Sequence, residues 1–213
     1  MRRLARGPAT RQWVAASTLL LFACLLVWQQ INGVFAFDQP LLKAVHSLSS
    51  PVIVEASRWL AWLGYGYGVL PIDGLIVLGL MAARRWRDAG FAFLALWGGL
   101  VLNTLLKHAI SRPRPGLDTV RELQSSYAFP SGHAMATAVL AATAIALTWH
   151  TRWRWPVLVI TGLFALLVGL GRVHAGVHYP SDVAAGWLAG IAWVCLIHIA
   201  VLGKREARPA PKV

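Results

Sequence analysis

Long apolar segments recur along the chain, and they constrain its fold more than any other feature of the sequence. A helix that crosses a bilayer needs about 20 mostly apolar residues. Six segments are candidates, at residues 13–34, 66–83, 91–110, 131–149, 155–172 and 182–202. Because backbone polar groups cannot stay unpaired in hydrocarbon, such segments must be helical. The sequence therefore predicts an all-α integral membrane bundle of six transmembrane helices.

The composition excludes an ordinary soluble domain. The chain is 57% hydrophobic and 13% charged, whereas soluble domains carry about 25% charged residues. Its 11 Trp residues are typical of membrane–water interfaces. A length of 213 residues predicts a single domain over residues 1–213.

The first apolar segment has a second interpretation. Four arginines precede it and Val34-Phe35-Ala36 resembles a cleavage site, as in a secretory signal peptide. The apolar stretch is long for a signal, however, and no soluble domain follows it. A retained membrane helix is therefore favoured.

Residues 37–63 differ from the segments around them, because charged residues interrupt them. Leu41, Leu42, Val45 and Leu48 have helical spacing, which predicts an amphipathic interfacial helix between the first and second spans. The alternative is that this stretch belongs to a longer second transmembrane helix.

The distribution of basic residues predicts the topology. Net charge is +12, and the Lys and Arg residues cluster between apolar runs, which fits membrane topology better than nucleic-acid binding. Thirteen of the 20 basic residues lie at the termini and in the two loops that share their side, which makes that side cytoplasmic. Most of the others gather in two loops on the outer side. Cys24 and Cys195 lie in apolar runs and predict neither a disulfide nor a metal site.

The first of these outer loops, residues 107–130, offers two cations for one anion. Lys107 ends the third span, and Arg114 follows it beyond a helix-stopping proline. Arginine matches phosphate oxygens with a planar fork, and lysine adds a point charge. The alternative is that both side chains extend to lipid headgroups.

The same loop ends in Pro130-Ser131-Gly132-His133, directly before an apolar helix. Ser131 is a good N-cap, and Gly132 lets a ligand approach the backbone. The start of a helix presents unpaired N–H groups and a positive dipole end, which favour an anion.

The second outer loop, residues 171–182, contributes Arg172, His174, His178 and Asp182. An aspartate four residues after a histidine can accept its Nδ1 proton and leave Nε2 free to attack. Arg172 is a third candidate phosphate ligand. His174 is interpreted as a lining or structural residue.

Taken together, these blocks resemble the signature of the type 2 phosphatidic acid phosphatase (PAP2) superfamily, over residues 107–182. Lys107 and Arg114-Pro115 fit its first motif, Pro130-Ser131-Gly132-His133 fits its second, and Arg172, His178 and Asp182 fit its third. The chain departs from the pattern at Gly171, where the family usually has serine. That departure affects one secondary hydrogen bond to phosphate.

The resemblance implies a metal-independent lipid phosphatase without a cofactor, in which His178 attacks phosphorus, Asp182 orients His178 and His133 protonates the leaving oxygen. It implies that the phosphoryl oxygens are held by Lys107, Arg114, Ser131, Gly132 and Arg172. A soluble vanadate-dependent haloperoxidase shares the signature, but the apolar spans argue against that class. The expected location is a bacterial inner membrane, with the site on the periplasmic face.

The expected substrate is a membrane lipid phosphate. Undecaprenyl pyrophosphate is favoured, because small bacterial members of the family often recycle it; phosphatidylglycerol phosphate, phosphatidic acid and a lipid A phosphate are the alternatives. A lipid phosphotransferase would use the same residues with a lipid acceptor in place of water. An anion transporter or channel would explain the cations but not the two histidines with an aspartate. The sequence does not predict an oligomeric state.

Overall fold

The computed structural model describes residues 8–48, 50–115 and 127–203, and every regular element in those ranges is a helix. The elements are α1 (Pro8–Asn32), α2 (Asp38–His46), α3 (Pro51–Leu63), α4 (Val69–Ala82), α5 (Trp86–Ile110), α6 (Gly132–Thr148), α7 (Arg154–His174) and α8 (Pro180–Leu202). The predicted all-α class is therefore confirmed for the described residues.

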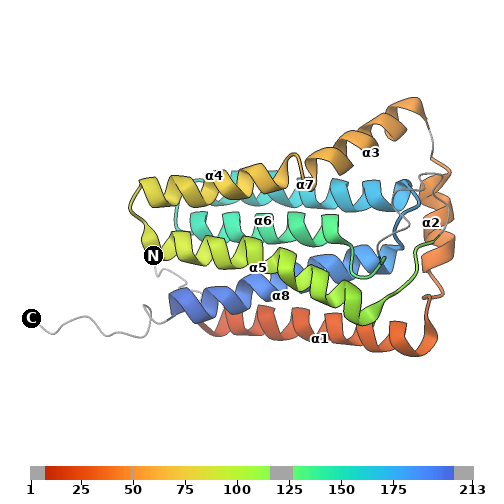
Figure 1. The fold of residues 1–213 in the computed structure, drawn as a ribbon, viewed down its shortest axis with the longest axis horizontal. Coiled ribbons are helices and arrows are strands. Elements are labelled where there is room, and N and C mark those ends of the chain that lie inside the picture. Colours follow the sequence, from red (N-terminus) through yellow and green to blue (C-terminus); the bar gives the residue numbers. More distant parts are fainter. Residues whose placement is uncertain (1–7, 49, 116–126, 204–213) are drawn as a thin grey trace, which may run out of the picture.

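The long helices run side by side, and α6 lies at their centre, packed against α5, α7 and α8 (Figure 1). Helix α1 packs against α8, and α4 packs against α5. Figure 1 also shows α2 crossing one end of the bundle and α3 leaning away from its long axis. The start of α1 and the end of α8 lie at the opposite end from α2.

Close packing between α6 and α8 depends on two glycines. A Cβ atom at Gly186 would lie 2.7 Å from the carbonyl oxygen of Ser131, and one at Gly190 would lie 3.0 Å from that of Met135. Small residues of this kind allow membrane helices to approach backbone to backbone. The first turn of α6 is thereby held directly against α8.

Four helical segments are long and apolar enough to cross a membrane, namely Thr10–Asn32, Trp86–Ile110, Arg154–His174 and Pro180–Leu202. The other two predicted spans form shorter helices. Helix α4 has 14 residues, because it starts only after the glycine-rich stretch 64–68, and at about 1.5 Å per residue it is shorter than a hydrocarbon core of about 30 Å. Helix α6 has 17 residues. The structure thus supports a multi-pass membrane protein, with four of the six predicted spans at full length.

The single interfacial helix predicted within residues 37–63 is wrong in one respect, because the stretch forms two helices. Ser50 and Pro51 explain the break: proline disfavours a helical conformation in the residue before it, and the Ser50 hydroxyl accepts a hydrogen bond from the Ile53 amide at 3.3 Å. Of the four residues expected on an apolar face, only Leu42 is fully buried, while Leu41 and Leu48 are exposed. Helix α2 contacts α7 and α8.

Candidate active site

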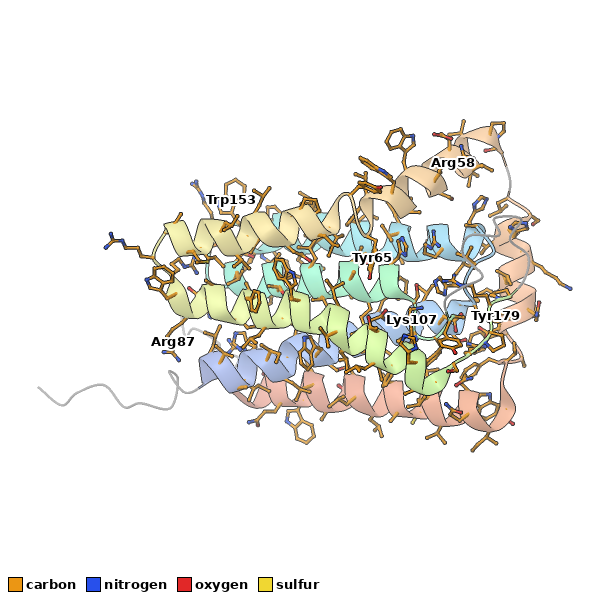
Figure 2. All side chains as sticks on the ribbon, in the orientation of Figure 1. Arg58, Tyr65, Arg87, Lys107, Trp153 and Tyr179 are labelled. Atoms are coloured by element: carbon orange, nitrogen blue, oxygen red, sulfur yellow. The ribbon has the colours of Figure 1, made fainter. Side chains whose placement is uncertain are left out.

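The three predicted motifs meet at the end of the bundle that α2 crosses. Lys107 lies in the last turn of α5, His133 in the first turn of α6, and residues 172–182 join α7 to α8. Figure 2 shows Lys107 and Tyr179 toward this end of the molecule. Part of the first outer loop, residues 116–126, lies outside the described residues.

His178 and Asp182 are placed by the start of α8. Pro180 opens the helix, and Asp182 Oδ2 accepts a hydrogen bond from the Tyr179 amide at 2.8 Å. This local cap places the Asp182 carboxylate beside His178, with 3.7 Å between Oδ2 and the His178 Nδ1 atom. That separation is longer than a hydrogen bond. His178 is only 1% exposed.

Three cations surround His178, as the sequence predicts. Arg114 donates to the Val177 carbonyl at 3.0 Å, and its Nη1 atom lies 3.5 Å from His178 Nε2. Burial, followed by the charges of Arg172, Arg114 and Lys107, lowers the pKa of His178 well below its ordinary value, while a backbone hydrogen bond with Ala128 acts in the opposite direction. The lowered pKa favours the neutral form of the His178 ring.

Lys107 and Arg172 approach the same place from two different helices. Lys107 Nζ donates a hydrogen bond to the Tyr127 carbonyl, at the near end of the second motif. Arg172 lies in the last turn of α7 and is 5% exposed. Both positive charges act on His178, and arginine and lysine are the side chains that bind phosphate oxygens, so the arrangement favours a phosphate group.

The second motif is tied directly to the third. The Ser131 amide donates to the Asp182 carbonyl at 2.9 Å. Ser131 is completely buried, and its hydroxyl has no hydrogen-bond partner among the described residues. A Cβ atom at Gly132 would lie 3.1 Å from Asn103 Oδ1. A side chain at Gly132 would therefore be crowded by Asn103 at the start of α6, and a buried hydroxyl next to it is available to an anion.

His133 is held by a part of the molecule that the motifs do not include. Its Nε2 atom lies 3.1 Å from the Ala61 carbonyl of α3. The Tyr65 ring lies beside it, with 5.1 Å between ring centroids. Both residues belong to the region around the end of α3, so this region forms one wall of the site.

His174 has contacts of its own. Its Nδ1 atom lies 3.0 Å from the Ser57 hydroxyl, and its carbonyl accepts a hydrogen bond from His46 at 2.7 Å. These partners lie on α3 and α2. The structure supports the structural interpretation of His174, as a residue that fastens α2 and α3 to the end of α7.

Two further buried charges, those of Arg112 and Asp38, lie beside the site and belong to none of the three motifs. Arg112 forms ion pairs with both Asp182 and Asp38, and all three side chains are at most 2% exposed. A signal for Asp38 exists in the sequence, since it is an isolated acid in an apolar stretch. Its partner, however, lies 74 residues away, and no local pattern reveals that pairing.

The described residues include no group of three or more His, Cys, Asp or Glu side chains that could hold a metal ion. An apolar cavity of about 550 Å³ lies between α1, α6, α7 and α8. None of the predicted phosphate ligands lines it, so it is separate from the cluster around His178.

Comparison with known proteins identifies the family. The family model described as the PAP2 superfamily matches residues 88–206 of this chain. The chain belongs to the PAP2 superfamily. That assignment confirms the resemblance carried by the three motifs, and the relatives make this chain a membrane lipid phosphatase of the PAP2 type.

Three similar proteins illustrate the assignment. Phosphatidylglycerophosphatase B of Bacillus subtilis is 31% identical over 186 residues, which cover 85% of this chain and 91% of that protein. An undecaprenyl-diphosphatase of Sulfolobus acidocaldarius is 26% identical, over 86% of this chain and 88% of that protein. The crystal structure of the transmembrane PAP2 type phosphatidylglycerolphosphate phosphatase from Bacillus subtilis matches with a TM-score of 0.79 and 29% identity, covering 94% of this chain and all of that one.

Proposed function

We propose that this PAP2 phosphatase hydrolyses its lipid phosphate through a phosphohistidine intermediate on His178. The observation that carries the proposal is the position of a buried, neutral imidazole among three cations, with a carboxylate on its Nδ1 side. Nε2, the opposite ring nitrogen, faces Arg114. A nucleophile, its orienting acid and the ligands for phosphate are thus gathered in one place.

In the proposed reaction, His178 Nε2 forms a bond to phosphorus while the bond from phosphorus to the leaving oxygen breaks. The leaving oxygen takes a proton from protonated His133. Nδ1 keeps its proton beside Asp182, so the phosphorylated ring is cationic. Water then attacks phosphorus and gives a proton back to His133, which releases inorganic phosphate and neutral His178.

The charge that develops on the phosphoryl oxygens is stabilised by Lys107, Arg114 and Arg172. Fixed cations aimed at transferring phosphoryl groups supply the main electrostatic stabilisation in such reactions. The Ser131 hydroxyl and the Gly132 amide add hydrogen bonds at the start of α6. No step of the proposed reaction is assigned to a metal ion.

For the substrate, we propose a bacterial membrane lipid with a terminal phosphate or pyrophosphate. Phosphatidylglycerol phosphate comes first, because the relative named for it is more similar to this chain than the undecaprenyl-diphosphatase is. Undecaprenyl pyrophosphate, the lipid favoured by the sequence analysis, comes second; phosphatidic acid and a lipid A phosphate complete the panel.

Phosphate release from purified protein in detergent micelles tests this proposal. We expect at least one lipid of the panel to be hydrolysed by the wild type and none by His178→Ala. Wild-type enzyme given ³²P-labelled substrate and quenched in alkaline detergent should retain label that is stable in base and lost in acid. Turnover without any label on His178 would contradict the covalent intermediate, and absence of turnover on every lipid would contradict the substrate class.

We further propose six membrane crossings with both termini in the cytoplasm, in which α4 and α6 complete the set of spans. The active site then faces the periplasm. Cysteine labelling tests this orientation. Thr119 of the first outer loop lies outside the described residues, so the labels are placed at the exposed positions Ser47 and Thr151. In a background with Cys24→Ala and Cys195→Ala, an impermeant maleimide should label Ser47→Cys in intact spheroplasts and Thr151→Cys only after lysis. The reverse pattern would overturn the orientation.

A further inference from the structure

A buried guanidinium, that of Arg112, lies between two carboxylates next to the proposed nucleophile. Its Nη1 atom is 2.5 Å from Asp182 Oδ1, and its Nη2 atom is 2.9 Å from Asp38 Oδ2. The ring of Tyr179 covers the guanidinium, 4.6 Å from its carbon. Arg112 therefore bridges α2 to α8 inside the site.

Asp38 also fastens the start of α8. Its Oδ1 atom accepts a hydrogen bond from the Ser181 amide at 2.9 Å, and its Oδ2 atom accepts one from the Ser181 hydroxyl at 2.6 Å. An amide in the first turn of a helix has no partner within the helix. A residue 143 positions away thus supplies the cap that α8 needs beside Asp182.

The two oxygens of Asp182 are divided between two tasks. Oδ1 binds Arg112, while Oδ2 accepts from the Tyr179 amide and faces His178 Nδ1. Because Arg112 holds the first oxygen, the carboxylate cannot rotate away from the histidine. Asp38 in turn holds Arg112 in place.

Charge gives Asp38 a second effect. An isolated pair of Arg112 and Asp182 would be neutral and would support a positive ring on His178 only weakly. Asp38 adds a second carboxylate, so that the three side chains together carry one negative charge. A cation forms on His178 when its Nε2 bonds to phosphorus, and this charge would stabilise it.

We propose that Asp38 and Arg112 are positioning residues for the His178–Asp182 pair, which fix the Asp182 carboxylate and keep one net negative charge beside His178. The catalytic purpose of that charge rests on the proposed function, whereas the positioning of Asp182 does not. It assigns the helix at the end of the bundle, α2, a role in the chemistry.

Variants that change the charge of the cluster in opposite directions provide the test. Asp38→Asn leaves the cluster neutral, and Arg112→Gln leaves it with two negative charges. The other charged or titratable groups that face His178 stay the same in both: Asp182 on α8, Arg172 on α7, Lys107 on α5, Arg114 after α5, and His133 on α6.

The measurement is a histidine-selective NMR titration of full-length enzyme saturated with inorganic phosphate, with the His178 resonance assigned by its loss in His178→Asn. We expect Asp38→Asn to lower the pKa of His178 and Arg112→Gln to raise it, each by roughly half a unit to one unit. The double variant should return close to the wild-type value. Shifts in the same direction, or none in either variant, would overturn the proposal.

Kinetics add a second readout. Asp38 contacts none of the proposed phosphate ligands, so Asp38→Asn should lower kcat about tenfold and leave KM unchanged. The matched control is Asp73→Asn, which removes another buried carboxylate, on α4, and should leave both the His178 titration and kcat unchanged.

Two complications have defined outcomes. If Arg112→Gln alone does not fold, Asp38→Asn is compared with the double variant. The pKa of His178 should then be higher in the double variant than in Asp38→Asn. If the titrations shift as expected but no lipid phosphate is hydrolysed, the proposed function fails while the positioning role stands. If lipid is hydrolysed but the titrations do not shift, the positioning role alone fails.

Discussion

His133 Nε2 lies 3.1 Å from the carbonyl oxygen of Ala61 on α3. A carbonyl oxygen only accepts hydrogen bonds, so Nε2 is the ring nitrogen that donates in this contact. The proposed leaving oxygen of the substrate would replace Ala61 as the acceptor. The contact with Ala61 thus orients the donor nitrogen of His133 toward the place where the leaving oxygen would lie.

The two histidines should respond differently to an activated leaving group. General acid assistance is worth about 10²–10⁴-fold, and p-nitrophenolate needs little of it. We expect His133→Ala to regain a substantial part of its activity with an aryl phosphate that the wild type hydrolyses, and His178→Ala to remain inactive because it lacks the nucleophile. Steady-state rates of both variants with lipid and aryl substrates provide the measurement.

Rescue of His178→Ala instead would show that the two roles are reversed. If neither variant responds, His133 has no acid role and serves only to bind phosphate.

Activity should survive removal of divalent metals. Lys107, Arg114 and Arg172 supply the positive charge, and Mg²⁺ sites in proteins are usually built on carboxylates. We expect the turnover rate in excess EDTA to match the rate in Mg²⁺ within about twofold. A catalytic metal supplies several kcal/mol of transition-state stabilisation, so its removal would lower the rate far more than that. Abolition by EDTA with recovery on adding Mg²⁺ would contradict the metal-free mechanism.

His178 should make stability depend on pH. Its pKa is lowered in the folded protein, so the ring stays neutral there while the unfolded chain takes up a proton below its ordinary pKa of about 6.5. Stability is therefore full above that pH and is lost as the pH falls below it, by up to about 1.4 kcal/mol per pH unit.

Thermal unfolding in detergent at pH 7.5 and pH 5.0 measures this effect. The wild type should lose more stability between these conditions than His178→Gln does. The control is His108→Gln, at an exposed histidine, which should lose as much as the wild type. An equal loss in His178→Gln would show that this histidine is not the titrating group.

Gly186 should be intolerant of a side chain. A Cβ atom there would come within 2.7 Å of the Ser131 carbonyl and push the second motif off α8. We expect Gly186→Ala to destabilise the protein by about 1–3 kcal/mol and to lower kcat. Gly79→Ala, at a position with nothing within 4 Å of the added Cβ, should have neither effect. Normal activity in Gly186→Ala would show that the α6–α8 contact can relax.

Local patterns predicted much of the fold and of the site. Apolar runs and helix-ending residues placed the long helices, and the spacing of the motifs selected the cations, the histidines and Asp182. The positions of those motif residues could be predicted because each motif lies at a helix end, where its neighbours in the chain determine its position.

Contacts across the chain could not be predicted in this way. Asp38 meets Arg112 from 74 residues away, and His133 meets Ala61 from 72 residues away. Both contacts depend on how α2 and α3 fold over the end of the bundle. The Ser50-Pro51 break that separates these helices was visible in the sequence, but its consequence for the site became clear only from the packing.

Asp182 combines several connections in a single residue. Its backbone carbonyl binds the Ser131 amide, one carboxylate oxygen binds Arg112, and the other caps Tyr179. Random mutagenesis would therefore find this position intolerant even in a screen that selects only for folding. A change at Asp38 on α2 would instead alter the charge near His178 while the hydrogen bond between Ser131 and Asp182 stays in place. Position 38 is therefore the better choice for engineering the chemistry of His178.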